Sequence, residues 1–361
     1  MRALVQTAFG GPEVVSLRRV PDPVPGPSDV LVRVRACALN RLDVLQRRGP
    51  AVLPGFRLPH IAGMDVAGHI EAVGAEVSGT KTVGTEVSGT EASGQAGGLA
   101  TGDRVVIDPT LGCGACPRCA AGDPGHCASV RVVGGNIAGG FAEYVAVPAR
   151  LVHRVPAHVG LAEAAALPSA WSTAWHATLT VGEVTAGETV LVQAAASAVS
   201  IAAVQLAKRA GARVVAVAGS DAKLALAGDL GADLLLRNDA DVPAAVRRFT
   251  GGEGADAALD HVGAATWRAS MDCLRPGGRL VTFGNTTGDE VTISLAGVYH
   301  RGLRLLGSGA YTEADFAAML AAYYGGGLRV VRRAEYGLDE LPAAFAAAES
   351  RAAIGKVLVR P

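Results

Sequence analysis

Four cysteines between residues 113 and 127 form the pattern with the most specific chemistry in the chain. They are Cys113, Cys116, Cys119 and Cys127, separated by two, two and seven residues. Thiolates at this spacing can surround one tetrahedral Zn²⁺ and leave no ligand position open, which is the structural type of zinc site. Because clustered cysteines in a chain without a signal peptide favour a metal over disulfides, the sequence predicts a structural Zn²⁺ here.

Three other interpretations of the cysteine cluster stay open at this point. An iron–sulfur cluster also begins with two CxxC steps, but its fourth Cys follows after three residues and precedes Pro, whereas Cys127 follows after seven and precedes Ala128. A redox disulfide pair is a second alternative. His126 is a third, since it could compete with Cys127 as a ligand, although four sulfurs already complete the site.

The elements that must position such a site fall into two regions. The first third of the chain shows short strand-like runs, such as 30–35 and 104–107, between turn signals. From about residue 185, strand-like runs mostly alternate with Ala-rich helical stretches; the runs are 189–192, 214–218, 257–261, 280–283 and 303–307. Strands separated by helices predict an α/β fold with a parallel sheet covered on both faces.

Composition excludes several classes of protein. The chain has 361 residues, with 33 Lys and Arg against 33 Asp and Glu, so it lacks the basic surface of a nucleic-acid reader. No signal peptide is recognisable, which predicts a cytoplasmic location. The uncharged run 189–207 is long enough to span a bilayer, but its scattered Gln and Ser residues favour a buried strand followed by a helix. We therefore expect no membrane partner.

Residues 74–103 contain a ten-residue echo, GAEVSGTKTV followed by GTEVSGTEAS and a weaker third copy. Three Gly-, Ser- and Thr-rich copies are too few for a solenoid, so the segment is interpreted as a duplicated surface hairpin or loop. Deletion of residues between about 77 and 100 is expected to change stability little.

Beyond the cysteines, the chain resembles the medium-chain dehydrogenase/reductase superfamily over nearly its whole length outside this insertion. The matching segments are 32–43, the GDRV turn at 102–105, GGFAEY at 139–144, 167–175, RPGGRLVTFG at 275–284 and the GK of 355–356. The resemblance implies a GroES-like β-rich catalytic domain (1–155 and 310–361) with a zinc lobe at about 108–130. It also implies a Rossmann dinucleotide-binding domain at 156–309.

The same resemblance indicates that the second, catalytic zinc of the alcohol-dehydrogenase branch is missing. Asn40, Met64 and Ser169 stand where that branch has its ligands, and Cys37 lies three positions too early to replace the first of them. Asn, Met and Ser do not make a zinc site. The pattern is similar to the quinone-oxidoreductase branch, which has Asn at the first position. That branch usually lacks the cysteine lobe, so the chain combines features of both.

The glycine-rich turn expected after the strand 190–192 is degenerate. Relatives read GAGSGVGSAA where this chain reads AAASAVSIAA from Ala194, so Ala198 and Ser200 replace two glycines. Glycine there lets the backbone approach a pyrophosphate, and added side chains are expected to weaken cofactor binding by roughly 1–3 kcal/mol without abolishing it. At the end of the next strand Gly219 stands where an NAD site usually has an acid, and Ser220 and Lys223 could receive a 2′-phosphate, which favours NADP(H).

The resemblance implies a set of site residues for each role. The catalytic candidates are Asn40, Asp43 and Thr173. The cofactor candidates are Ala194, Ala196, Ser197, Ala198, Val199, Ser200, Gly219, Ser220, Lys223, Gly284, Asn285 and Lys356.

Three functions compete on this sequence. The first is a zinc-independent NAD(P)H-dependent reductase of a quinone, enone or related small conjugated carbonyl. The second is a repurposed enzyme that catalyses a cyclisation, elimination or isomerisation without a nicotinamide cofactor. The third is a non-enzymatic binding protein. A homodimer or homotetramer with a small-molecule substrate is expected in the first two cases.

Overall fold

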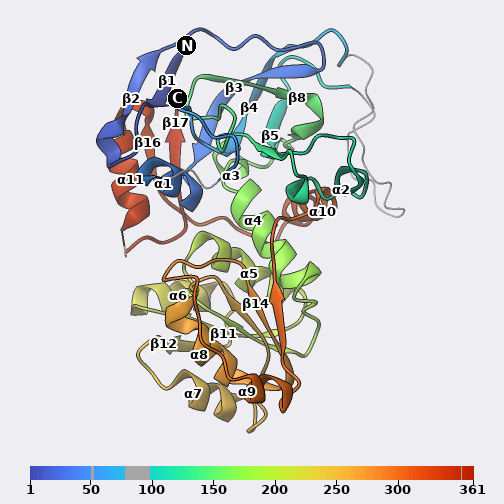
Figure 1. Ribbon diagram of the computed structural model, residues 1–361, viewed down its shortest axis with the longest axis vertical. Helices are drawn as coiled ribbons and strands as arrows, with labels where there is room; N and C mark the ends of the chain where they lie inside the picture. The colour runs from blue at the N-terminus through green and yellow to red at the C-terminus, as the bar shows by residue number, and fades with distance from the viewer. Residues whose placement is uncertain (50–52, 78–97, 351) are drawn as a thin grey trace.

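The molecule consists of a β-rich part, which contains both chain termini, and an α/β part built on a parallel sheet (Figure 1). The structure is a computed structural model that describes residues 1–49, 53–77, 98–350 and 352–361. Most of the repeat insertion, residues 78–97, lies outside the described residues. Its flanking residues Val77 and Leu99 are buried in the core of the β-rich part, so only the segment between them is a candidate for deletion.

The β-rich part is organised around a sheet whose described strands follow the order β16-β17-β3-β4-β5-β9, with β8 also paired to β3. The strands of the β-rich part as a whole are β1 (Arg2–Gln6), β2 (Val15–Arg19), β3 (Asp29–Ala38), β4 (Asp65–Val73), β5 (Arg104–Ile107), β6 (Thr110–Leu111), β7 (Arg131–Val132), β8 (Tyr144–Pro148), β9 (Val152–Arg154), β16 (Arg332–Gly337) and β17 (Lys356–Arg360). Its helices are α1 (Arg41–Arg48), α2 (Pro117–Ala120), α3 (Leu161–Ala164) and α11 (Leu341–Glu349).

The α/β part contains a sheet in the order β12-β11-β10-β13-β14-β15, and every pairing in it is parallel. Its strands are β10 (Thr189–Val192), β11 (Arg213–Ala218), β12 (Leu234–Arg237), β13 (Ala255–Asp260), β14 (Leu274–Thr282) and β15 (Arg304–Gly307). Its helices are α5 (Ala198–Arg209), α6 (Asp221–Asp229), α7 (Val242–Phe249), α8 (Ala264–Cys273) and α9 (Leu295–Tyr299). If the six strands of this sheet are numbered as they occur in the sequence, they lie side by side in the order 3-2-1-4-5-6. This is the doubly wound order, and proteins that have it bind ligands between the first and fourth strands.

The predicted α/β fold with a β-rich catalytic domain and a Rossmann sheet is therefore confirmed. The run 189–207 forms β10 and α5, and within the described residues no helix has both the length and the apolar character needed to cross a bilayer. The division of the chain near residues 155 and 310 stays a proposal, which the two sheets support.

Helices α4 (Pro168–Trp175) and α10 (Glu313–Tyr324) lie where the two parts meet (Figure 1). Trp171 of α4 is buried and its ring meets that of Tyr323 of α10 edge-on, with ring centroids 5.0 Å apart. The same hydrophobic cluster includes Val106 of β5 and Val190 of β10. One continuous core thus joins the two parts.

Candidate functional site

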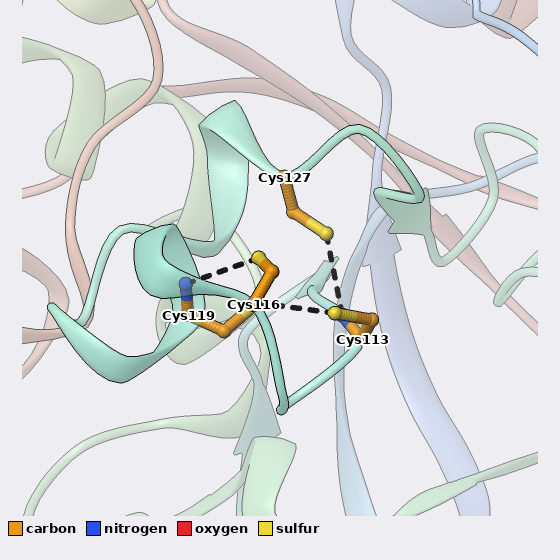
Figure 2. A group of neighbouring side chains, drawn as sticks. All are labelled: Cys113, Cys116, Cys119 and Cys127. Carbon is orange, nitrogen blue, oxygen red and sulfur yellow. Dashed lines mark hydrogen bonds between the residues drawn. The ribbon is translucent and has the colours of Figure 1, made fainter.

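The four cysteines of the predicted metal site converge in the structure (Figure 2). Their Sγ atoms all lie within 4.8 Å of one another, and those of Cys113 and Cys119 are 4.0 Å apart. A tetrahedral zinc with Zn–S bonds near 2.3 Å requires sulfurs about 3.8 Å apart, so a small contraction would complete the site. Among the described residues this is the group of His, Cys, Asp or Glu side chains that meets the geometry of a metal centre.

Electrostatics within the cluster also suit a cation. Hydrogen bonds from the backbone N–H groups of Ala115 and Cys116 lower the pKa of the Cys113 thiol to about 6. The Sγ of Cys127 accepts from the N–H groups of Cys113 and Ser129, at 3.5 and 3.4 Å. Such bonds stabilise thiolates, which are the form that binds metal. His126 is not part of the cluster, because its Nδ1 lies 2.8 Å from Oδ1 of Asp123.

A second cluster of side chains forms at the positions where the family resemblance places the catalytic zinc ligands of the alcohol-dehydrogenase branch. Asn40, at the N-terminus of α1, accepts a hydrogen bond through Oδ1 from Nζ of Lys356. The same ammonium lies 2.7 Å from Oδ2 of Asp65, whose Oδ1 accepts from the N–H and hydroxyl of Ser169 at 2.9 and 2.5 Å. Lys356 and Asp65 have 5% and 0% of their side chains exposed, so this is a buried ion pair.

Asp43 is buried next to this cluster and contacts it through the backbone of Asn40. Its carboxylate accepts from the N–H of Asn40 at 2.7 Å and of Gly63 at 3.1 Å, and the residue is buried. Burial raises the pKa of Asp43 to about 7, although the two backbone hydrogen bonds oppose the rise. These contacts favour a positioning role for Asp43 at the start of α1, next to Asn40, and its assignment as a catalytic residue stays a prediction.

Lys356 is predicted as a cofactor contact, and that assignment stays a prediction. In the structure its ammonium is held by Asp65 and Asn40 in the β-rich part. Only the neighbouring backbone reaches the dinucleotide turn, where the N–H of Gly355 donates to the carbonyl of Ala196 at 3.1 Å. Thr173 lies one turn after Ser169 on α4, is half-buried, and has no hydrogen bond to its hydroxyl among the described residues.

The turn between β10 and α5 keeps its form without the glycines. Ala194 adopts the left-handed conformation with φ of 47°, and Ser197 caps α5 by accepting from the N–H of Ser200 at 3.1 Å. Ser200 is fully buried, and its hydroxyl donates to the carbonyl of Gln193 at 2.8 Å. The Ser200 hydroxyl is therefore directed at protein partners, and the expected weakening of cofactor binding by Ala198 and Ser200 stays a prediction.

His261 is a contact that the sequence analysis missed. It follows β13, and its Nε2 lies 3.0 Å from Oγ of Ser197 and 3.1 Å from Oγ of Ser200. Ser200, which replaces a glycine of the turn, and Ser197, which precedes the other replaced glycine, thus both form hydrogen bonds with one histidine at the end of the neighbouring strand. A joint consideration of the new serines and the strand-end histidine could have found this network.

The first turn of α5 can still receive an anion. The N–H of Ser200 is used by the Ser197 cap, and the parallel bridge between Ser197 and Gly355 engages the N–H of Ala198, whereas the N–H of Val199 has no hydrogen-bond partner in the described part of the chain. An N–H directed outward at the start of a twelve-residue helix favours an anion such as a pyrophosphate. The residues present therefore fit the phosphates of a dinucleotide.

The part of the dinucleotide that carries the 2′-phosphate in NADP(H) would lie at the carboxyl end of β11. Gly219 and Ser220 follow this strand as expected, and Lys223 lies in the first turn of α6. The nearest acid, Asp221, is 91% exposed and pairs with Arg237 of the adjacent strand β12 at 3.0 Å. Arg237 is a second cation at this position that the sequence analysis did not name.

The carboxyl ends of β14 and β15 border an open pocket of about 480 Å³. Its lining includes the predicted residues Gly284 and Asn285, together with Ser308 and the unpredicted His126. The hydroxyl of Ser308 is buried and has no hydrogen-bond partner among the described residues. Phe283 also lines the pocket, and its ring centroid lies 5.4 Å from that of His261, so the pocket borders the histidine that contacts the phosphate turn.

Comparison with known proteins decides what kind of protein carries these sites. Residues 26–157 match the alcohol dehydrogenase GroES-like domain family, and residues 198–323 match the zinc-binding dehydrogenase family. A quinone oxidoreductase of Pseudomonas aeruginosa is 31% identical over 318 residues, which cover 86% of this chain and 83% of that protein. The chain belongs to the medium-chain dehydrogenase/reductase superfamily.

Two further relatives extend the comparison. An acryloyl-coenzyme A reductase of Sulfurisphaera tokodaii is 27% identical over the whole of both chains. A crystal structure of an NAD-dependent alcohol dehydrogenase superposes with a TM-score of 0.91, at 39% identity and with both chains fully covered. This member of the superfamily is accordingly an enzyme, an NAD(P)H-dependent oxidoreductase. The cysteine cluster is positioned to hold a zinc ion in it.

Proposed function

We propose that this enzyme reduces the activated C=C bond of a small conjugated carbonyl compound, such as a quinone, an enone or an enoyl thioester, without a catalytic metal. The observation that carries the proposal is the Asn40–Lys356–Asp65–Ser169 cluster. It stands where the alcohol-dehydrogenase branch has zinc ligands, and it is closed on itself by an ion pair and hydrogen bonds. The quinone and acryloyl-coenzyme A reductases among the relatives support the substrate class.

The cluster is ill-suited to a metal for two reasons. The only carboxylate in it, Asp65, is already neutralised by Lys356 at 2.7 Å, and Asn40 and Ser169 are weak zinc ligands. An incoming Zn²⁺ would also be repelled by the ammonium of Lys356, which has 5% of its side chain exposed and cannot move into water without breaking the ion pair. We infer that Lys356 and Asp65 hold Asn40 in place.

The chain's own groups can orient a carbonyl. Asn40 donates one Nδ2 hydrogen to the carbonyl of Ala38 at 3.3 Å and accepts through Oδ1, which leaves one Nδ2 hydrogen for substrate. The unpartnered hydroxyl of Thr173 is a second donor on the same helix face as Ser169. Donors directed at the carbonyl oxygen stabilise the enolate that forms when the β-carbon is reduced.

A reduced nicotinamide, when bound, would supply a hydride for the β-carbon. Asn40 and Thr173 would stabilise the negative charge on the carbonyl oxygen, and solvent would supply the proton for the α-carbon. The start of α5, with the free N–H of Val199, would hold the pyrophosphate. Ser220, Lys223 and Arg237 favour NADPH over NADH, since no unpaired acid ends β11 among the described residues.

The alternative of a cofactor-free, non-redox enzyme was motivated by the replacement of two glycines by Ala198 and Ser200. The burial of Ser200 and its hydrogen bond to the carbonyl of Gln193 weaken the part of that motive that concerns Ser200.

The test is a matched pair of acceptors, methyl vinyl ketone and its saturated counterpart butanone, each assayed with NADPH and NADH. The proposal expects oxidation of NADPH with the enone only, and deuterium from 4-deuterated NADPH at the β-carbon of the product. Asn40→Ala should lower kcat/KM by about tenfold to a hundredfold, while Asn136→Ala, in a loop outside the cluster, serves as control. Reduction of butanone, or oxidation of simple alcohols at a comparable rate, would contradict the proposal.

A further inference from the structure

His261 lies against two side chains of the turn between β10 and α5. It follows β13, the strand that pairs with β10 in the parallel sheet. Its Nε2 lies 3.0 Å from Oγ of Ser197 and 3.1 Å from Oγ of Ser200. Its ring centroid also lies 5.4 Å from that of Phe283, which follows β14. Contacts with the start of α5 and with the segment after β14 thus hold the imidazole beside the phosphate turn.

Close packing fixes the backbone on both sides of His261. A Cβ on Gly284 would lie 2.8 Å from the carbonyl oxygen of His261 and 3.0 Å from its Cβ, so only glycine allows the two strand ends to approach this closely. The buried carboxylate of Asp260 accepts hydrogen bonds from the N–H groups of Val262 and Gly263 at 2.8 and 3.2 Å. The imidazole therefore extends from a rigid part of the sheet.

The hydrogen-bond pattern determines which nitrogen of His261 carries the proton. Oγ of Ser200 donates its hydrogen to the carbonyl of Gln193 at 2.8 Å, so toward Nε2 of His261 it can act only as an acceptor. Nε2 therefore carries a hydrogen. Burial lowers the pKa of His261 from its usual value, so the neutral imidazole with Nε2–H is the form present at neutral pH.

Ser197 is left with a hydroxyl hydrogen that has no acceptor among the described residues. Its Oγ accepts from the N–H of Ser200 at 3.1 Å and lies 3.0 Å from the protonated Nε2 of His261, so its lone pairs are engaged and its hydrogen is not. Ser197 is only partly buried and is the N-cap of α5, two residues before Val199 with its free N–H. An O–H and an N–H are thus both available to an anion here.

We propose that the Ser197 hydroxyl donates a hydrogen bond to the diphosphate of the bound dinucleotide, and that His261 is the positioning residue that keeps this hydrogen available. An unprotonated Nε2 would instead use the hydrogen of Ser197 within the protein. A side-chain donor can reach a phosphate that the Cβ of Ala198 keeps away from the backbone, so the pair offsets part of the lost glycine turn. The inference rests on the dinucleotide binding of the proposed function and is independent of the substrate.

Ligands with and without the diphosphate test this inference. Dissociation constants of NADP⁺, NAD⁺ and adenosine 2′-monophosphate, which lacks the diphosphate, are measured by calorimetry on the full chain. Loss of one hydrogen bond to a charged group predicts that Ser197→Ala weakens NADP⁺ binding about tenfold and leaves adenosine 2′-monophosphate binding unchanged. Ser197→Thr retains the hydroxyl and should bind NADP⁺ as the wild type does. Thermal melts of both variants show whether loss of the α5 cap has destabilised the fold.

Variants of His261 test its positioning role. His261→Phe removes the Nε2–H and should weaken NADP⁺ binding less than Ser197→Ala does, whereas His261→Gln retains an N–H at the place of Nε2 and should restore most of the affinity. His300→Phe, at an exposed histidine after α9, should leave NADP⁺ binding unchanged. A ¹⁵N spectrum of histidine-labelled protein should show the Nε2–H tautomer for the signal that is absent from His261→Gln.

Several results would overturn the inference. These are wild-type NADP⁺ affinity in Ser197→Ala, equal weakening of NADP⁺ and adenosine 2′-monophosphate binding in a folded Ser197→Ala variant, an Nδ1–H tautomer of His261, or no saturable binding of either dinucleotide. The proposed function fails separately, if NADP⁺ binding depends on Ser197 but methyl vinyl ketone is not reduced.

Discussion

The buried ion pair between Lys356 and Asp65 gives the sharpest quantitative prediction. Substitution Lys356→Met removes the ammonium and leaves the Asp65 carboxylate, which has no exposed surface, with only the two hydrogen bonds from Ser169. Removing one partner of a buried pair costs about 3–5 kcal/mol, because the remaining charge stays desolvated. With an unfolding entropy of about 2.1 cal/mol/K per residue, a loss of about 4 kcal/mol lowers the Tm of this 361-residue chain by about 5 °C.

The control is a pair of the same type at the surface. Lys208 and Asp233 are 2.8 Å apart, but their side chains are 30% and 34% exposed, so Lys208→Met should cost less than about 1 kcal/mol. The double variant Asp65→Asn/Lys356→Met removes both charges and should regain at least half of the loss. Urea unfolding followed by circular dichroism, together with thermal melts, measures all three. A Lys356→Met variant as stable as Lys208→Met would refute the conclusion that the cluster is closed by a desolvated ion pair.

Three further predictions concern the metal, the pH dependence and the dinucleotide turn. Metal analysis should find one zinc per chain and Cys119→Ser should lose it; two zincs per chain would show a catalytic metal after all. Burial lowers the pKa of His153, whose ring packs 4.9 Å from that of Phe316, from 6.5 to about 4. The unfolded state therefore binds more protons in this range, and stability should fall by about 2 kcal/mol from pH 7.5 to 5. His153→Phe should flatten that slope, and an unchanged slope would contradict the assignment. Ser200→Gly removes two hydrogen bonds and should lower the Tm without tightening NADPH binding, measured by fluorescence titration, whereas tenfold tighter binding would show that Ser200 obstructs the phosphate after all.

The sequence predicted the features that depend on local spacing. The two CxxC steps and the seven-residue gap were enough to identify the cysteine cluster, because all four ligands lie on one short lobe. The alternation of strands and helices was enough for the parallel sheet, since each strand is recognisable by itself.

The features that the sequence did not predict depend on long-range contacts or on side-chain direction. Asp65 and Lys356 are 291 residues apart, so no local pattern indicates that their charges compensate one another. Ser200 was interpreted by its size alone, while its effect depends on which way the hydroxyl turns. His126 was considered only as a competitor for the metal, because nothing in the spacing shows that β15 passes beside the lobe.

The position of β17 has a consequence for how this chain is made. This strand lies between β16 and β3 in the sheet of the β-rich part, although β3 precedes the Rossmann sheet in the sequence and β17 follows it. During vectorial synthesis on a ribosome, the Cys37–Ala38 end of β3, which pairs with β17, must therefore wait unpaired while the Rossmann sheet is translated, whereas its Asp29–Arg33 part already has β8 as a partner. Asp65 waits equally long for Lys356, which is translated 291 residues later. The nascent β-rich part is thus the segment most exposed to premature pairing and to chaperone binding. Most of it leaves the exit tunnel before the Rossmann sheet does.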